Sequence, residues 1–189
     1  MVEGGLRRCP WAGNDPAMIA YHDSEWGVPC HDDGALFERL MLESFQAGLS
    51  WSTILRKRAA FYEAFEGWNP VRIAAYGPDD VARLLDDVRI VRNRAKIAAA
   101  ISNARAFLAT QAEYGEFERY LWSFASQPDA RARPVTPADV PVTTPESEAL
   151  SQDLRRRGFR FVGPTICYAL MQSVGMVDDH LVGCVCATE

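Results

Sequence analysis

The helical spacing of apolar residues constrains the fold of this 189-residue chain more than any other feature. Two apolar series follow the acidic pair at positions 32–33, and their spacing is that of an amphipathic helix with acidic residues in its first turn. The series are Leu36, Leu40 and Ala47, and Phe37, Met41 and Phe45. Similar patterns predict further helices over residues 52–65, 71–75, 78–85, 92–108, 116–124, 147–157 and 165–174. Strand patterns are weak throughout, so the chain is predicted to be all-α.

Prolines mark one long segment without helical spacing. Residues 128–145 hold five of the eleven prolines. A chain of this length can bury a core of its own. We therefore interpret the segment as a long loop within a single domain, residues 1–189, rather than as a boundary between two domains.

The composition is that of an ordinary soluble globular protein, with 48% hydrophobic and 24% charged residues. No apolar run approaches the length of a membrane span, and the first residues lack the apolar core of a signal peptide. We therefore expect a cytoplasmic monomer without a membrane partner.

The net charge of −5 argues against binding to nucleic acid through the overall field of the protein. It leaves room for a local basic face, because a few Lys and Arg side chains on phosphates can dock a duplex. Basic residues gather at positions 56–58, 89–96 and 155–160. Each of these clusters could equally be a solvated helix face.

Cysteine and histidine residues near the two ends of the chain form a candidate metal site. Five cysteines, an odd number, do not resemble a disulfide framework. Cys9 and His22 lie near one end, and His180 and Cys184 near the other. Two Cys and two His make the closed tetrahedral set of a structural zinc, which would join the terminal regions. Cys186 competes for a place in the set, and the alternative is that these cysteines are simply buried thiols.

Glu43 lies on the apolar face of the helix expected after position 32. It follows Leu40 by three residues and precedes Ala47 by four, so helical geometry turns its carboxyl toward the core. A buried carboxyl needs a partner or a ligand, because its desolvation is costly. The alternative is a structural Glu answered by a nearby Arg or Trp side chain.

Four aromatic residues in the first third of the chain favour a ligand for Glu43. They are Trp11, Tyr21, Trp26 and Trp51, and the three tryptophans stand in turn-like contexts. Aromatic faces attract positive charge, and a carboxylate accepts hydrogen bonds. Together these groups suit a flat, cationic, aromatic ligand.

The segment at positions 156–165 joins two expected helices through a tight turn. Gly163 followed by Pro164 fits a helix start, where free backbone N–H groups form an anion site suited to a DNA phosphate. Thr165 belongs to the same first turn. The segment is similar to a helix–hairpin–helix element, with Phe161 in place of the first glycine of the usual turn.

These residues together closely resemble the DNA-3-methyladenine glycosylase I family. The resemblance runs from about residue 8 to residue 184. The motifs that carry it are Cys-Pro-Trp at 9–11, Tyr-His-Asp-Ser-Glu-Trp-Gly-Val-Pro at 21–29, Glu43 with Gln-Ala-Gly-Leu-Ser-Trp at 46–51, Leu-Trp-Ser-Phe at 121–124, Arg-Gly-Phe-Arg-Phe-Val-Gly at 157–163, and Asp-His-Leu-Val-Gly-Cys at 179–184.

The resemblance implies an all-α helix–hairpin–helix DNA glycosylase with one structural zinc. It implies that Cys9, His22, His180 and Cys184 bind the zinc, and that Gly48 and Leu49 probe the gap in the base stack. The residues implied to hold or surround the flipped 3-methyladenine are Glu43, Tyr21, Trp51, Trp11 and Trp26. The expected substrate is double-stranded DNA containing alkylated bases.

We expect Glu43 to be the catalytic residue and water to be the nucleophile, because no Lys is placed by a motif to form a Schiff base. This predicts base-excision repair by a monofunctional enzyme, with an abasic site as product and no strand cleavage.

Two departures from the family pattern carry expectations of their own. Arg89 stands where relatives commonly have Gly, and Asp178 stands where they can carry Asn. We interpret Asp178 as a capping or supporting carboxylate beside His180. Two rival functions stay open on the sequence: a zinc-stabilised DNA-binding module without catalysis, and a small-molecule protein with an aromatic cage for cations.

Overall fold

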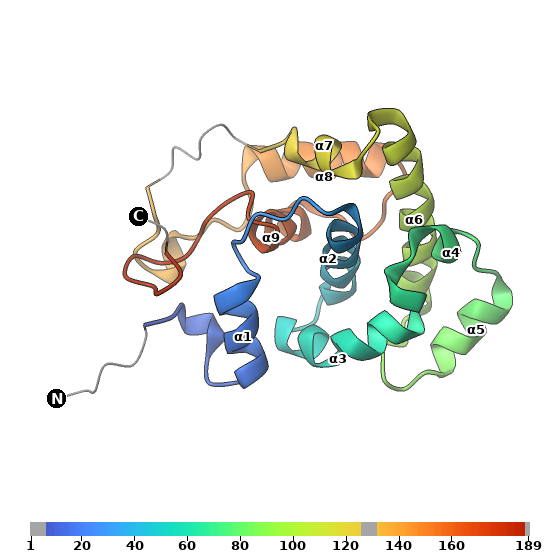
Figure 1. Cartoon of the computed structure of the whole chain (residues 1–189), viewed down its shortest axis with the longest axis horizontal. Coiled ribbons are helices and arrows are strands. Elements are labelled where there is room, and N and C mark those ends of the chain that lie inside the picture. The colour runs from blue at the N-terminus through green and yellow to red at the C-terminus, as the bar shows by residue number, and fades with distance from the viewer. Residues whose placement is uncertain (1–6, 126–131, 188–189) are drawn as a thin grey trace.

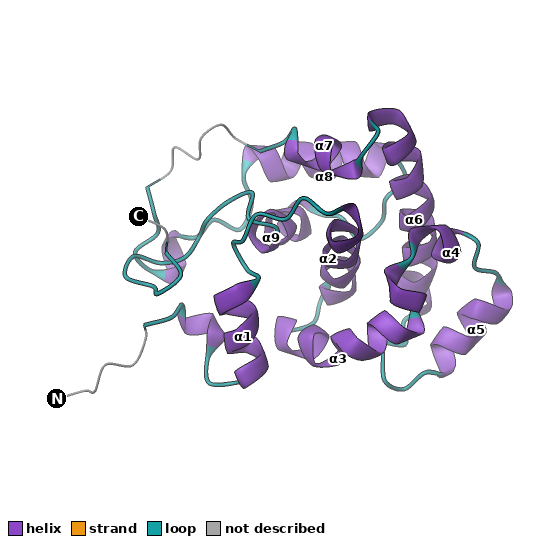
Figure 2. Ribbon diagram, in the orientation of Figure 1, coloured by secondary structure: helices purple, strands orange, loops and turns teal. Residues whose placement is uncertain are grey.

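The computed structural model describes residues 7–125 and 132–187 (Figure 1). No strand occurs in the described part of the chain, which confirms the all-α prediction (Figure 2). None of the described helices combines the length and the apolar character needed to cross a membrane. The α-helices are α1 (Pro16–Ser24), α2 (Asp33–Gln46), α3 (Trp51–Ala64), α4 (Pro70–Ala74), α5 (Pro78–Asp86), α6 (Arg94–Tyr114), α7 (Phe117–Trp122), α8 (Pro145–Arg156) and α9 (Pro164–Ser173).

Helix α2 lies in the middle of the molecule, as Figure 1 shows, and packs against α3, α6, α7 and α9. The Asp32 side chain caps it by accepting a hydrogen bond from the Ala35 N–H at 2.8 Å. The predicted apolar face is the buried one, since Leu36, Phe37, Leu40 and Met41 are all enclosed. Burial of this stripe orients every other side chain of α2, including Glu43.

Helix α1 was not among the predicted helices. Its apolar residues are spread around the helix rather than gathered on one face, so no amphipathic pattern marks it in the sequence. The structure shows a helix that Asp15 caps, with its side chain accepting from the Ala17 N–H. Helix α1 packs on α3 and brings Tyr21 and His22 into the interior.

The long proline-rich loop is described from residue 132 onward, and positions 128–131 of the prediction lie outside the described residues. It contains one short 3-10 helix, η3 (Pro137–Asp139). Near the chain ends, the Val185 N–H donates to the Arg7 carbonyl at 2.8 Å. The two terminal regions therefore lie side by side, as the zinc prediction requires.

Helices α8 and α9 are joined by a tight turn at residues 157–163 and pack on each other. Gly158, at φ +95°, ends α8, and Gly163 with Pro164 starts α9. Phe159 and Val162 are buried and fasten the turn to the core. The two helices and the tight turn expected for this segment are therefore present.

Candidate functional site

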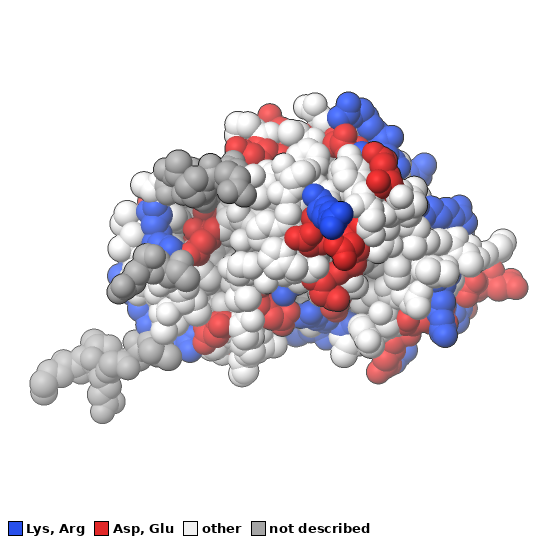
Figure 3. Space-filling view, turned by 45° about the horizontal axis from the view of Figure 1, so that its top comes forward, with Lys and Arg blue, Asp and Glu red and all other residues white. Residues whose placement is uncertain are grey.

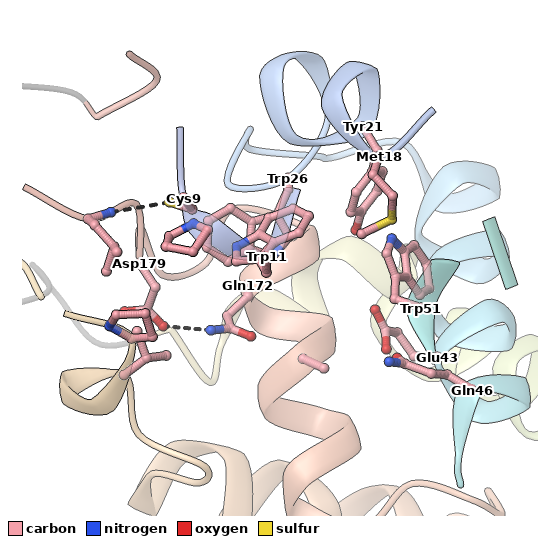
Figure 4. A pocket seen from close by; sticks show the side chains of 15 residues that line it. Cys9, Trp11, Met18, Tyr21, Trp26, Glu43, Gln46, Trp51, Gln172 and Asp179 are labelled. Carbon is pink, nitrogen blue, oxygen red and sulfur yellow. Dashed lines mark hydrogen bonds between the residues drawn. The ribbon is translucent and has the colours of Figure 1, made fainter. Parts of the chain in front are cut away.

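A cavity of about 620 Å³ lies between α1, the second half of α2, the start of α3, α9 and the 137–140 segment. Figure 4 shows the side chains around it. The lining residues are Cys9, Pro10, Trp11, Met18, Tyr21, Trp26, Glu43, Gln46, Trp51, Pro137, Val140, Ala169, Gln172, Asp179 and Leu181. All five residues predicted to hold the base line this one cavity.

Glu43 lies at one end of the cavity and is 3% exposed. Its Oε2 has no hydrogen-bond partner in the described chain. The charge of Arg39 acts on Glu43, but its guanidinium donates to the carbonyls of Ser173 and Glu25. Burial raises the pKa of Glu43 to about 8, against a smaller opposing effect of the Arg39 charge. Glu43 is thus a desolvated carboxyl whose Oε2 receives no hydrogen bond from the described residues.

The aromatic rings predicted to surround Glu43 contact one another. The ring centroids of Tyr21 and Trp51 lie 4.9 Å apart, and those of Trp11 and Trp26 lie 5.0 Å apart. Trp51 Nε1 is buried without a hydrogen-bond partner among the described residues, like the Glu43 oxygen. Burial, with a further contribution from Glu43, raises the pKa of Tyr21, which therefore stays a neutral phenol.

Asp179 is the carboxyl at the other end of the cavity, and the sequence interpretation missed it. It is buried, and its Oδ2 accepts a hydrogen bond from the Tyr168 hydroxyl. The same oxygen accepts from Gln172 Nε2, as Figure 4 shows. Asp178, the residue that the sequence singled out, does not line this cavity. The sequence offered no means to choose between neighbouring aspartates whose directions depend on an irregular loop.

Asp178 has the supporting position expected of it. Its Oδ1 accepts from the His180 backbone N–H at 3.1 Å and lies 2.9 Å from His180 Nδ1. Arg133 donates to its other oxygen at 2.8 Å.

Gln46 is a second cavity residue that the sequence interpretation missed. It follows Glu43 by three residues, so the helical spacing used for Glu43 could have found it.

A cluster of His and Cys side chains adjoins the cavity beyond Trp26. The ligand atoms of His22, His180, Cys184 and Cys186 all lie within 4.8 Å of one another, so the group could hold a metal ion. Cys9, the fourth predicted ligand, is buried at the edge of this group, and its Sγ accepts from the Leu181 N–H at 3.4 Å. The structure therefore brings three of the four predicted ligands together, and Cys186 rather than Cys9 is the fourth member of the group.

The two histidines of this cluster are oriented by carboxylates. His22 Nδ1 lies 2.7 Å from Asp23 Oδ1, as His180 Nδ1 does from Asp178 at 2.9 Å. His180 Nε2 is then buried without a partner in the described residues. Gly27 allows the close approach of this ring, because a Cβ there would lie 2.8 Å from His180 Cε1. His22 Nε2 accepts from the Cys9 backbone N–H at 3.3 Å and lies 3.4 Å from Cys184 Sγ. A carboxylate on one ring nitrogen, with the other nitrogen directed toward thiols, is typical of metal-binding histidines.

The residues predicted to contact DNA lie at two turns outside the cavity. Gly48, at φ +78°, and Leu49 form the turn between α2 and α3, and both are exposed. Gly163 and Thr165 lie at the start of α9, where Thr165 is exposed. Both turns therefore present backbone or side chains to solvent.

Many of the basic residues are neutralised within the protein. Arg58 pairs with Glu25 and Glu38, and Arg157 pairs with Glu113 and Asp153. On the face that Figure 3 shows, acidic and basic side chains lie next to each other in several places. Within the clusters at 56–58 and 155–160, Arg58, Arg156 and Arg157 are therefore engaged in ion pairs of the protein itself.

Arg89 is also paired, to Asp87 and Glu63, and its backbone does not lie in the left-handed region. The Arg89 side chain is therefore accommodated at this position without backbone strain.

Comparison with known proteins places this arrangement among DNA repair glycosylases. The family model described as methyladenine glycosylase matches residues 11–187. DNA-3-methyladenine glycosylase 1 of Escherichia coli is 47% identical over 181 residues, which cover 96% of this chain and 97% of that protein. The chain belongs to the methyladenine glycosylase family.

Solved structures agree. A crystal structure of 3-methyladenine DNA glycosylase I superimposes with a TM-score of 0.93 at 47% identity, covering 96% of this chain and all of the other. The enzyme of Staphylococcus aureus, in a structure described as the basis of its 3-methyladenine recognition, gives a TM-score of 0.92 at 34% identity and covers 98% and 99%.

Proposed function

We propose that this protein is a monofunctional DNA glycosylase of base-excision repair that hydrolyses the N-glycosidic bond of 3-methyladenine in alkylated duplex DNA. The observation that carries the proposal is the buried Glu43 carboxyl, which faces an aromatic cavity and has no protein partner for Oε2 in the described chain. A cationic purine supplies both missing elements, since it brings a positive charge and hydrogen-bond donors.

Charge explains how such a site discriminates between bases. In the empty cavity the pKa of about 8 keeps Glu43 mostly protonated near neutral pH. A cationic base lowers that pKa, so binding of the alkylated base favours the carboxylate form. Neutral adenine offers no charge to offset the desolvated carboxylate. The flipped lesion is therefore favoured by charge, by stacking on Tyr21 and Trp51, and by its weak pairing in the duplex.

The reaction needs little acid catalysis, because the alkylated base already carries a positive charge. As the bond between C1′ and N9 breaks, its electron pair passes to the base, which leaves neutral. Water adds to C1′ and releases a proton, giving an abasic site in an intact strand. The task of Glu43 and the aromatic rings is to bind the charged base in the geometry that leads to cleavage.

The direct test is to incubate the purified protein with duplex DNA treated with a methylating agent. We expect free 3-methyladenine in solution and strands that break only after alkali. A DNA-binding module without catalysis would retain the duplex and release no base. A cage for small cations would bind a methylated purine without binding the duplex.

We also infer a structural zinc held by Cys9, His22, His180 and Cys184. Thiolates and imidazoles are the ligands that zinc prefers, and four protein ligands leave no position for a substrate. Cys184 Sγ lies 3.4 Å from His22 Nε2, whereas Cys186 Sγ lies 3.8 Å from Nδ1, the nitrogen that Asp23 occupies. This difference argues against Cys186. Cys9 lies on the Nε2 side of His22, where its backbone N–H donates to that nitrogen at 3.3 Å, and this supports Cys9 as the fourth ligand.

Metal analysis should find about one zinc per chain. Cys9→Ala and Cys186→Ala form a matched pair for the ligand assignment. We expect Cys9→Ala to lose zinc and Cys186→Ala to retain it. The opposite result would exchange the two residues, and metal-free protein of full stability would end the zinc proposal.

For DNA docking we propose that Gly48 and Leu49 probe the base stack. The start of α9, at Gly163 and Thr165, would contact a phosphate as the second half of a helix–hairpin–helix element. The exposure of both turns supports this assignment.

A further inference from the structure

Phe161, in the turn between α8 and α9, has an unusual backbone conformation. Its φ is +54°, in the left-handed region that favours glycine, and its ring is 37% exposed. Trp68, another aromatic residue with positive φ, at +55°, is 2% exposed and stacks on Phe65 at 4.7 Å. Burial offsets the strain at Trp68, whereas Phe161 has the strain and an exposed ring.

The residues beside Phe161 hold it in this conformation. The Asn103 side chain accepts from the Arg160 N–H at 2.7 Å and donates to the Arg160 carbonyl at 3.1 Å. The Ser151 hydroxyl donates to the Val162 carbonyl at 2.6 Å. Because Val162 is itself buried, the backbone is fixed on both sides of Phe161. These backbone contacts, rather than contacts of the ring itself, hold Phe161 in its left-handed conformation.

The ring lies next to the turn that is proposed to probe DNA. Lys96 Nζ is 6.0 Å from the Phe161 ring centroid. The same ammonium donates to the Ala47 carbonyl at 2.6 Å, directly before Gly48 and Leu49. Leu49 is 41% exposed. Two exposed apolar side chains from distant parts of the sequence thus occupy neighbouring turns.

Positive charge accompanies these side chains. Arg155 and Arg160 are exposed, and the ion pairs of this segment within the described chain involve Arg156 and Arg157 instead. The Arg155 guanidinium approaches Gly163, since a Cβ there would lie 3.5 Å from its Nη2. Apolar side chains beside unpaired arginines are the combination that proteins use to unstack bases while holding phosphates.

We propose that Phe161 is a DNA-contacting residue, whose ring packs on the bases or sugars beside the flipped nucleotide as the second apolar wedge after Leu49. This inference rests on the proposed function, because it requires duplex DNA as the substrate. It gives the strained residue a purpose: a glycine would fit the turn without strain but would have no ring to place against DNA.

The test compares Phe161→Gly with Phe161→Tyr. Glycine accepts the positive φ, so the thermal midpoint of Phe161→Gly should stay within about 2 °C of the unmodified protein. Its affinity for a duplex containing an uncleavable abasic analogue should fall about tenfold to a hundredfold, the usual effect of removing one stacked aromatic ring. Phe161→Tyr should bind as the unmodified protein does. Tyr62→Ala, which removes an exposed ring from α3, is the matched control and should leave DNA affinity unchanged.

Binding of free 3-methyladenine, followed by tryptophan fluorescence, separates this inference from the proposed function. We expect Phe161→Gly to bind the free base unchanged, since Phe161 does not line the cavity. Unchanged duplex affinity, or equal losses of duplex and free-base binding, would overturn the role of Phe161. If the unmodified protein neither binds the duplex nor releases a base, the proposed function itself fails.

Discussion

Glu43, on α2, and Lys96, which reaches the C-terminal end of α2 from α6, are two buried ionisable residues. They differ in their hydrogen-bond partners. Lys96, on α6, is 7% exposed and donates to the carbonyls of Phe45 and Ala47 at 2.7 and 2.6 Å. Glu43, on α2, is buried as deeply, yet its Oε2 has no partner in the described chain. Burial lowers the pKa of Lys96 and raises that of Glu43.

The hydrogen-bond partners of Lys96 indicate a structural role, whereas the missing partner of Glu43 Oε2 is consistent with the proposed ligand. The last carbonyls of a helix lack intrahelical partners, and an ammonium there satisfies them while complementing the helix dipole. Lys96 therefore closes α2 and fixes the turn that leads to Leu49. No group of the described chain pairs with Glu43 Oε2. Under the proposed function, a cationic base supplies that partner and offsets the desolvation of the carboxylate.

The largest effect is expected at Glu43. Glu43→Gln preserves shape but removes the charge, and we expect kcat/KM for 3-methyladenine release to fall about 100- to 1,000-fold. Glu38→Gln, on the same helix but paired with Arg58, is the matched control and should act nearly as the unmodified protein does. Release of the base at the normal rate by Glu43→Gln would remove this residue from the mechanism.

Lys96→Met should lower stability rather than chemistry. The substitution leaves the Phe45 and Ala47 carbonyls without their charged donor, and the free energy of unfolding should drop by about 2–4 kcal/mol. Urea unfolding measures this change. Arg94→Met, an exposed position on the same helix, should change it by less than about 0.5 kcal/mol. If the two variants are equally stable, Lys96 is not the residue that closes α2.

The pH dependence of stability should report the raised pKa of Glu43 directly. The pKa of Glu43 is about 8 in the folded protein and near 4.5 when unfolded. Between these values the folded state keeps a proton that the unfolded state has released, so stability falls as pH rises from about 5 to 8. We expect a loss of about 3–4 kcal/mol relative to Glu43→Gln, measured by urea unfolding at both pH values. Parallel pH profiles for the two proteins would contradict the raised pKa.

The smallest effect is expected for an exposed charge. The Arg89 side chain is 55% exposed and pairs with Glu63, at 65%, and with the less exposed Asp87, at 17%. Solvent around the guanidinium screens these pairs. Arg89→Gly, which restores the residue common in relatives, should leave both base release and thermal stability unchanged within error. A large loss of DNA affinity would instead assign Arg89 a contact with the duplex.

Local patterns in the sequence determined most of the helices and the direction of Glu43. Helical spacing alone places Glu43 on the face of Leu36 and Leu40, because residues three, four and seven apart share a side of a helix. The helix that escaped prediction, α1, has no such one-sided pattern. Turn chemistry likewise located the start of α9 at Gly163 and Pro164.

Only the tertiary structure decided what each of these side chains meets. It turned Asp179 rather than Asp178 into the cavity and placed Phe161 near the turn that carries Leu49. It also gave Lys96 two carbonyl acceptors, whereas Glu43 Oε2 has no hydrogen-bond partner in the described chain. These outcomes depend on segments far apart in the chain and on irregular loops, where no periodicity fixes direction. Helical spacing determines the direction of each side chain relative to its own helix. The residues that this side chain contacts on other elements depend on tertiary packing, which local spacing does not encode.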